Sequence, residues 1–342
     1  GTSTDSQFTI PTYSGESYNY NVDCNDDGSP EITGAIGDFT CNYSAAGSYT
    51  ISIIGNSLDG TGFPRIYFND GGDKDKLVSI DQWGTGAWSS MASAFYGCSN
   101  LAGHAVDAPD LTNVTDMSRM FHGASVFNQS IEDWNTINVS DMSYMFTGAS
   151  SFNQSIGSWN TSNVTDMRNM FRGASCFNQA IGSWDTGNVN DMRNMFWNAS
   201  VFDQPIGNWD VSNVTTMYQM FPHAWDFNQD IGDWDTGSVT DMRYMFVDAL
   251  NFDQDISGWD VTSLTAASDM FSGATLSTAN YDALLIGWDA QNLHSDVTFS
   301  GGNSTYCAGE SARAHMISSD GWTITDGGKG CPFTIFLPLV NN

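Results

Sequence analysis

Apolar and polar positions repeat every 25 residues through the middle of the chain. Columns of identical residues show this repeat without a slip. The tryptophan column consists of Trp134, Trp159, Trp184, Trp209, Trp234 and Trp259, and phenylalanine and glutamine recur in the same way from Phe127 and Gln129. A fixed period of this length is typical of a solenoid, in which each unit buries its apolar face only against its neighbours. The repeat therefore predicts a scaffold of stacked coils.

Within one repeat, the pattern predicts a short helix, a short strand and a turn. The apolar positions follow the i, i+3, i+4, i+7 spacing of a two-turn helix: Met117, Met120, Phe121 and Ala124. A turn is expected near Gly123, and residues 127–131 then alternate as a strand does. Gly, Asn and Asp residues around the tryptophan form the next corner. We expect a repeat solenoid whose coils stack in parallel.

An acidic column precedes the predicted helices. Its members are Asp116, Asp141, Asp166, Asp191 and Asp241, with Thr216 in the remaining copy. Helix capping explains every copy, so we prefer it to a metal site along the column. Arg168, Arg193 and Arg243 each follow one of these carboxylates by two residues and are expected to reduce the repulsion between them.

The aromatic columns have two interpretations. Stacked tryptophans and phenylalanines can form a continuous core beside an amide ladder of glutamines. Alternatively, the tryptophans can be an exposed stripe that binds sugar rings. Because the tryptophan recurs at one fixed internal register, we prefer the core.

Both ends of the array depart from the repeat, as the caps of a solenoid do. Residues 88–101, WSSMASAFYGCSNL, form a degenerate copy in which Met91 and Phe95 match the repeat after a one-residue slip. The segment YDALLIGWDAQNL, residues 281–293, reads as an amphipathic helix that covers the other end.

The N-terminal part alternates in a different way, with short strand patterns separated by turns, as in an all-β sandwich. The segments YNYNVDCNDDG and CNYSAAGSYTISI resemble the PKD-type immunoglobulin-like domain. Asp23, Asn25 and Asp27 match the first half of a calcium-binding loop, but Gly34 stands where the closing glutamate belongs. Calcium is therefore the weaker interpretation, and a tight polar turn the preferred one.

These patterns divide the chain into four parts. We expect a PKD-like β-sandwich over residues 1–75 and the solenoid with its N-terminal cap over residues 76–274. A C-terminal capping region covers residues 275–332, and an apolar strand-like tail covers residues 333–342.

Six cysteines add two predicted disulfides. Cys24 and Cys41 flank a turn-rich segment, and Cys307 and Cys331 flank the closing segment, so oxidising surroundings would follow. Cys98 and Cys176 lie about three coils apart, roughly 14 Å at ~4.8 Å per coil, beyond the ~7 Å limit for a disulfide. We expect both to be buried small residues.

Composition narrows the function classes. The net charge of −29 repels nucleic acid and anionic membranes over most of the surface. No run reaches the ~20 apolar residues of a membrane-spanning helix, and the polar start GTSTDSQ suggests a mature, secreted chain. The histidines share no register, and no catalytic motif is present, so we do not expect an enzyme.

The repeat resembles a known family. The segments NVTDMSYMF, IDQWGTGAWSSMASAFYGCSNL and NYDALLIGWDAQNL together are similar to the BspA-like leucine-rich-repeat surface proteins of bacteria, over about residues 63–328. The resemblance implies an extracellular or surface-attached protein associated with adhesion, with no catalytic residues to assign.

Two functional hypotheses follow. A structural or adhesive protein could assemble head to tail into a fibre by adding a tail strand to a neighbouring molecule; the assembly residues would be Phe333, Ile335, Phe336, Leu337, Leu339 and Val340. Alternatively, a module binding polysaccharide or a cell-surface protein would use aromatics that are not shared by every copy: Trp197, Tyr218, Trp225 and Tyr244.

Overall fold

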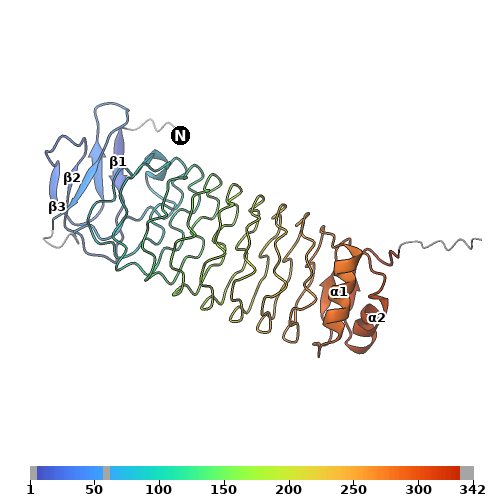
Figure 1. Ribbon diagram of the computed structural model, residues 1–342. Coiled ribbons are helices and arrows are strands. Elements are labelled where there is room, and N and C mark those ends of the chain that lie inside the picture. The colour runs from blue at the N-terminus through green and yellow to red at the C-terminus, as the bar shows by residue number, and fades with distance from the viewer. Residues whose placement is uncertain (1–5, 57–61, 332–342) are drawn as a thin grey trace, which may run out of the picture.

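The protein is an elongated stack of coils with a small β-structured unit at one end and a helical unit at the other (Figure 1). The structure is a computed structural model and describes residues 6–56 and 62–331. Among these residues, no helix is long and apolar enough to cross a membrane.

The N-terminal unit consists of two small antiparallel sheets. In one, β1 (Gln7–Ile10) pairs with β4 (Phe39–Asn42). In the other, β2 (Tyr20–Asp23) lies between β3 (Ile32–Ala35) and β5 (Ser52–Gly55). The two sheets share one core, formed by Ile10, Tyr18, Tyr20, Val22, Cys24, Ala35 and Cys41. A short 3-10 helix, η1 (Lys74–Lys76), follows before the stack begins.

In the stack, successive repeats lie side by side in register. Parallel bridges join equivalent residues of neighbouring coils, from Asp116 with Asp141 through to Asp241 with Ala266. The rings of Phe146, Phe171 and Phe196 stack with centroids 5.7 Å apart at each step. The degenerate first copy joins the same ladder with the expected slip, since the Phe95 amide donates to the Met120 carbonyl and the Phe95 and Phe121 rings stack.

The predicted helix of the repeat is wrong, although its buried face is right. Met117, Met120, Phe121 and Ala124 are completely buried, yet residues 118–123 form consecutive turns with left-handed backbone at Arg119 (φ +55°) and Gly123 (φ +73°).

The reason lies in where the backbone amides of this segment donate. Alternate amides bond the following coil at 2.7 to 3.0 Å; the donors are Met117, Arg119, Phe121 and Gly123. The amides between them bond carbonyls three residues earlier in their own coil at 3.0 to 3.2 Å; these donors are Met120, His122 and Ala124. A helix would direct all of them along its own axis. The stacked turns instead satisfy each amide while tying every coil to the next.

The aspartate column caps these turns rather than helices. The Asp116 carboxylate accepts the amide of Ser118 at 2.8 Å, and the Asp141 carboxylate does the same for Ser143. Thr216 replaces the carboxylate in its coil and accepts the Tyr218 amide at 3.3 Å. The column therefore caps turns, and its predicted role as a set of helix N-caps is wrong together with the helix.

The predicted strand over residues 127–131 and its glutamine ladder also differ from expectation. The segment forms no regular strand. From Gln154 onward, each glutamine amide donates to the side chain one residue before the glutamine of the preceding coil, as Gln179 does to Asn153 at 2.9 Å. The same asparagine accepts the backbone amide of Asn178 at 3.0 Å. The ladder therefore alternates glutamine with asparagine, or with aspartate at Asp203.

The tryptophan column is core, as preferred above. Trp184 is only 4% exposed, and its indole N–H donates to the Ile156 carbonyl of the preceding coil at 3.0 Å. Trp159, Trp209, Trp234 and Trp259 make the same bond. Each indole thus adds a buried hydrogen bond between coils to its apolar packing.

The C-terminal unit lies at the end of the stack, and the helix expected over residues 281–293 spans residues 278–289. In α1 (Thr278–Asp289), Trp288 extends the tryptophan column by donating to the Ile256 carbonyl. The helix α2 (Glu310–Ser319) packs beside α1, and β6 (Thr298–Ser300) pairs in parallel with β7 (Thr323–Thr325). The buried carboxylate of Asp282 accepts three amides from Cys307, Ala308 and Gly309, which positions the start of α2.

Candidate functional site

One face of the stack gathers the side chains that vary between repeats. It is formed by the positions equivalent to Ser118, Arg119, His122 and Gly123, which alternate with the buried positions of the turns; we call it the turn face. Its larger side chains are Arg119, His122, Tyr144, Arg168, Arg172, Arg193, Trp197, Tyr218, His223, Arg243 and Tyr244, all at least partly exposed.

Positive charge is concentrated on the turn face. The chain has seven arginines against 39 acidic residues, and five of the seven arginines lie here. Three of them pair with the capping aspartates two residues earlier: Arg168 with Asp166 at 3.3 Å, Arg193 with Asp191 at 2.5 Å, and Arg243 with Asp241 at 2.7 Å. The expected charge compensation within the aspartate column is therefore present.

The ionisation of the capping column reflects this packing. Burial raises the pKa of Asp166, whereas the Arg168 amide and guanidinium act in the opposite direction, and the carboxylates of neighbouring coils add to the rise. The hydrogen bond from Arg193 to Asp191 raises the pKa of the Arg193 guanidinium. The arginines thus offset the repulsion among stacked carboxylates.

Aromatic rings alternate with these cations. His122 stacks between Tyr96 and Tyr144, with ring centroids at 4.4 and 6.2 Å. The Arg119 guanidinium lies over the Tyr144 ring at 4.6 Å. The Arg172 guanidinium lies over the Trp197 ring at 3.9 Å. Contacts at these distances are cation–π interactions, so the face presents prearranged ring and guanidinium surfaces.

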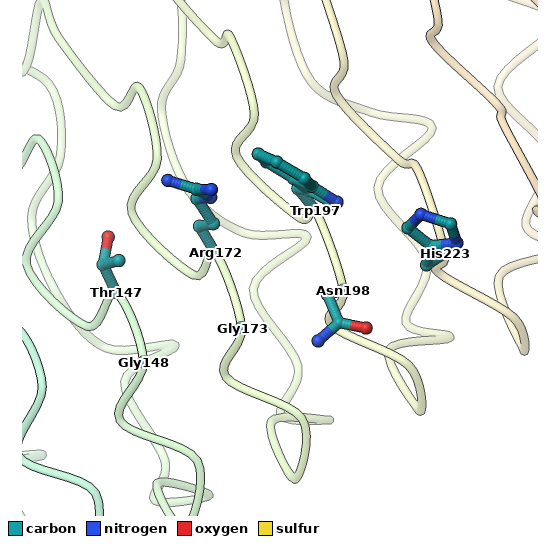
Figure 2. Close-up of a pocket in the computed structure, with 7 residues that line it drawn as sticks. All are labelled: Thr147, Gly148, Arg172, Gly173, Trp197, Asn198 and His223. Carbon is teal, nitrogen blue, oxygen red and sulfur yellow. The ribbon is translucent and has the colours of Figure 1, made fainter.

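An open hollow of about 450 Å³ crosses four successive coils of the turn face (Figure 2). We call it the Arg172 groove; its lining residues are Thr147, Gly148, Arg172, Gly173, Trp197, Asn198 and His223. A second hollow of about 360 Å³, the Tyr218 groove, lies farther along and is lined by Arg193, Thr215, Thr216, Tyr218, Thr240, Asp241 and Arg243.

The floor of the Arg172 groove follows from backbone geometry. Gly148, Gly173, Asn198 and His223 occupy equivalent left-handed positions, with φ between +57° and +71°. The amide at each of these positions donates to the carbonyl of the following coil at 2.7 or 2.8 Å. Glycine adopts this conformation without steric cost, and asparagine tolerates it better than most residues. The two glycines also leave the floor without side chains.

The four aromatics predicted to bind ligand are not all together. Trp197, Tyr218 and Tyr244 lie on the turn face, and the Tyr218 and Tyr244 rings meet edge to face at 5.9 Å. Trp225 is 48% exposed but belongs to a different column, next to Leu250 of the following coil. The structure thus brings three of the four residues onto one surface.

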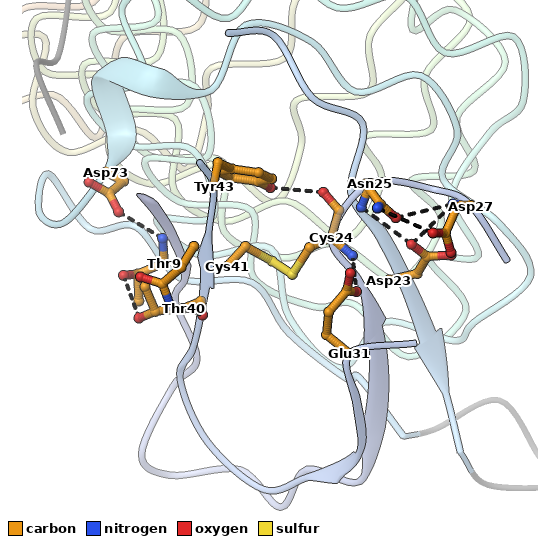
Figure 3. Close-up of a disulfide and its surroundings, with 11 residues drawn as sticks. Thr9, Asp23, Cys24, Asn25, Asp27, Glu31, Thr40, Cys41, Tyr43 and Asp73 are labelled. Carbon is orange, nitrogen blue, oxygen red and sulfur yellow. Dashed lines mark hydrogen bonds between the residues drawn. A yellow bond between two sulfur atoms is a disulfide. The ribbon is translucent and has the colours of Figure 1, made fainter. Parts of the chain in front are cut away.

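The polar turn of the N-terminal unit accounts for the residues considered for calcium (Figure 3). The Asp23 carboxylate accepts the amides of Asn25, Asp27 and Gly28 at 3.3, 3.2 and 2.7 Å. Burial acts to raise the pKa of Asp23, but these amide donors outweigh it and the pKa is lowered. The carboxylate oxygens therefore hold the tight turn that the sequence favoured.

Both predicted disulfides are present. Cys24 and Cys41 join the two N-terminal sheets with Cα atoms 5.7 Å apart, and Cys307 and Cys331 are bonded at 4.8 Å. Cys98 is buried as expected, but Cys176 is exposed, so its predicted burial is wrong. The proposed assembly tail, Phe333 to Val340, lies outside the described residues.

One cluster was missed in the sequence because its members come from separate helices. Asp289 at the end of α1 meets His315 and Asp320 around α2, with their ligand-type atoms within 4.8 Å of one another. The His315 ring bonds the Asp289 carboxylate at 2.7 Å, and this bond raises the pKa of His315. The pair links the two capping helices at the surface.

The comparisons with known proteins identify the repeat. The family model described as Mycoplasma protein of unknown function, DUF285, matches residues 89–198 and 177–284. Neither a curated protein nor a solved structure matches the chain. The matched segments overlap and together span residues 89–284, more than half of the 342 residues. The chain therefore belongs to this family, DUF285.

Proposed function

We propose that the protein is a non-enzymatic, extracellular adhesion protein that binds its partner through the turn face. In this proposal the stack is a leucine-rich-repeat-like solenoid, the N-terminal sheets form an immunoglobulin-like sandwich, and the last helices are a cap. The observation that carries the proposal is the concentration of five arginines and most of the non-repeating aromatics on one face of an otherwise strongly acidic chain.

The packing of the coils supports a binding role for this face. Its backbone amides are satisfied within and between coils, so the backbone bonding that joins the coils does not depend on which large side chain stands at each outward position. Rings and guanidinium groups are held against one another before any ligand arrives, which reduces the entropy lost on binding. Arginine and aromatic residues are also the types that dominate interaction surfaces.

The extracellular setting rests on two supports. Disulfides persist in oxidising surroundings, and this chain has two. The family match agrees with the resemblance to BspA-like surface repeat proteins, since that family is often linked to them.

A pair of matched variants tests the proposal. The turn-face variant combines Arg172→Gln, Trp197→Ser, Tyr218→Ser and Tyr244→Ser. The control variant changes four exposed apolar residues away from the turn face to serine: Val126, Ile137, Val201 and Leu250. Both are applied, with the unchanged protein, to glycan arrays and to immobilised cell-surface proteins. We expect the turn-face variant alone to lose binding. Equal binding by both variants refutes the proposal. A separate Trp225→Ser variant then shows whether any binding that remains depends on Trp225, which lies outside the turn face.

Head-to-tail assembly into a fibre stays a prediction, because the tail lies outside the described residues. Deletion of residues 333–342 is expected to leave the folded monomer intact and to abolish filaments. Electron microscopy of the full-length and shortened proteins measures this directly. Full-length protein that stays monomeric at high concentration rules out the fibre.

A further inference from the structure

The Arg172 groove differs in charge from the rest of the molecule. The chain carries 39 acidic residues, yet the groove is lined by hydroxyl, amide, glycine, imidazole, indole and guanidinium groups and by no carboxylate. Figure 2 shows the side chains of Thr147, Arg172 and Trp197 projecting from three successive coils along the groove. A carboxylate adjoins this lining at its far end, where Asp248 lies 3.3 Å from the His223 ring. The part of the groove around Arg172 is therefore locally cationic on an acidic protein.

Arg172 itself lacks the acidic neighbour that other arginines of this face have. Arg168, in the same coil, pairs with Asp166, and Arg193 in the next coil pairs with Asp191. Within residues 6–56 and 62–331, no carboxylate lies within ion-pair distance of Arg172, and its guanidinium makes no hydrogen bond. Its flat face rests on Trp197 at 3.9 Å. Stacking leaves the N–H groups at the edge of the guanidinium available, and these groups match the oxygens of a carboxylate or sulfate.

The shape of the groove suits an extended polymer. It runs across coils rather than into the molecule, and its glycine floor offers no obstructing side chains. Arg119 lies on the same face two coils before Arg172, in a neighbouring column, and it also stacks on an aromatic ring without an ion pair in the described structure. Two unpaired arginines on rings, two coils apart, fit a chain that carries anionic groups at intervals. The Asn198 amide, one coil beyond Arg172, offers a partner for the hydroxyl groups of such a chain.

We propose that the Arg172 groove binds an acidic polysaccharide, with an anionic group of one sugar on the Arg172 guanidinium and the sugar chain lying along the stack over Gly148 and Gly173. This inference rests on the proposed binding function of the turn face and names its ligand class. The overall negative charge of the protein does not prevent it, because at physiological salt the screening length is about 8 Å, so the nearest charges dominate. The anion can be a uronate carboxylate or a sulfate, since both offer the same geometry to a guanidinium.

The decisive experiment compares Arg172→Gln with Arg168→Gln. Both substitutions remove one positive charge from the same coil, but Arg168 is already paired with Asp166. Binding to polygalacturonate, to a sulfated glycan and to neutral dextran is measured by calorimetry with the full chain at low and moderate salt. We expect Arg172→Gln to weaken binding to the anionic polymer about tenfold or more and Arg168→Gln to change it less than about threefold. Arg172→Lys, which keeps the charge but loses the planar fork, should fall between them.

The outcomes separate this inference from the proposed function. Loss with polygalacturonate identifies a uronate, and loss with the sulfated polymer alone identifies a sulfate; either supports the inference. Equal loss in the two glutamine variants, binding of dextran that is insensitive to Arg172, or no binding to any of the three polymers overturns it. In each of those cases, the comparison of the turn-face variant with the control variant on glycan arrays and cell-surface proteins still shows whether this face binds another ligand. Unchanged urea midpoints of the variants exclude misfolding as the cause of a loss.

Discussion

The buried indole hydrogen bond between coils makes a quantitative prediction. Trp184→Phe removes the N–H that bonds the Ile156 carbonyl at 3.0 Å while keeping an aromatic ring in the column. That carbonyl also accepts the backbone amide of Trp159 at 3.2 Å, so it retains one partner. Loss of the hydrogen bond should therefore cost about 1 kcal/mol.

The smaller ring adds a packing cost. Trp184 is 4% exposed and stacks on Trp209 with ring centroids 6.4 Å apart. Complete truncation of such a residue to alanine costs about 3–5 kcal/mol, and phenylalanine preserves more than half of the side chain. The substitution should then cost about 1–2 kcal/mol in packing, and about 2–3 kcal/mol together with the hydrogen bond.

Urea unfolding followed by far-ultraviolet circular dichroism measures this change. The midpoint for Trp184→Phe should fall by roughly 1 M with an unchanged slope, for a slope of about 3 kcal/mol per molar. Trp197→Phe is the matched control, because Trp197 is a partly exposed residue of the turn face, and it should cost about 0.5 kcal/mol. Equal midpoint shifts for the two variants would refute the structural role given to the tryptophan column.

Three further predictions concern backbone strain, pH and thiol reactivity. Gly173→Ala forces a side chain into a left-handed turn (φ +71°) and should cost about 1 kcal/mol of stability. Gly173→Asn should cost less, since Asn198 occupies the equivalent turn. Urea midpoints show which variant loses more stability, and equal losses contradict the strain argument. Burial lowers the pKa of His122 below its usual 6.5, so its contribution to stability is present above pH 6.5 and is lost as pH falls through the lower folded-state pKa. His122→Phe keeps the stacked ring and should flatten this part of the plot of unfolding free energy against pH. An unaltered plot would exclude His122 as the source of the pH dependence. Exposed Cys176 should react with a thiol reagent in the folded protein. Cys98 should react only after unfolding, because it is buried and its burial raises its pKa. Labelling of both thiols at the same rate would contradict the packing of the first coil.

The side of the chain that is buried could be predicted from the sequence, but the local structure of the repeat could not. The spacing of Met117, Met120 and Phe121 places them on one side in a helix and in a series of tight turns alike. A helix and these turns differ in which carbonyls the backbone amides bond, and in the turns half of those carbonyls belong to the next coil. Gly123 was the available signal against a helix, because glycine is a poor residue for a helix interior and a good one for a left-handed turn.

The burial of Cys176 was predicted incorrectly because the residue was judged by its own type. Its column contains Asp226 and Asn251 in later repeats, and polar residues at equivalent positions indicate an exposed site. The disulfides were predictable because each pair flanks a short segment. The Arg172 groove was not, since Thr147, Arg172, Trp197 and His223 come from four repeats and meet only when the coils stack.

The alternation of amide donors also has a consequence for how such a surface can change over generations. Because every turn is held by backbone bonds and by buried methionine and phenylalanine side chains, the outward positions can be exchanged coil by coil without altering the supporting frame. Duplication of one 25-residue unit would lengthen the face by one coil, about 4.8 Å, and add a new set of outward side chains in register with the old. The length of the face and the number of binding positions on it can therefore change by whole coils, independently of which side chains each coil presents.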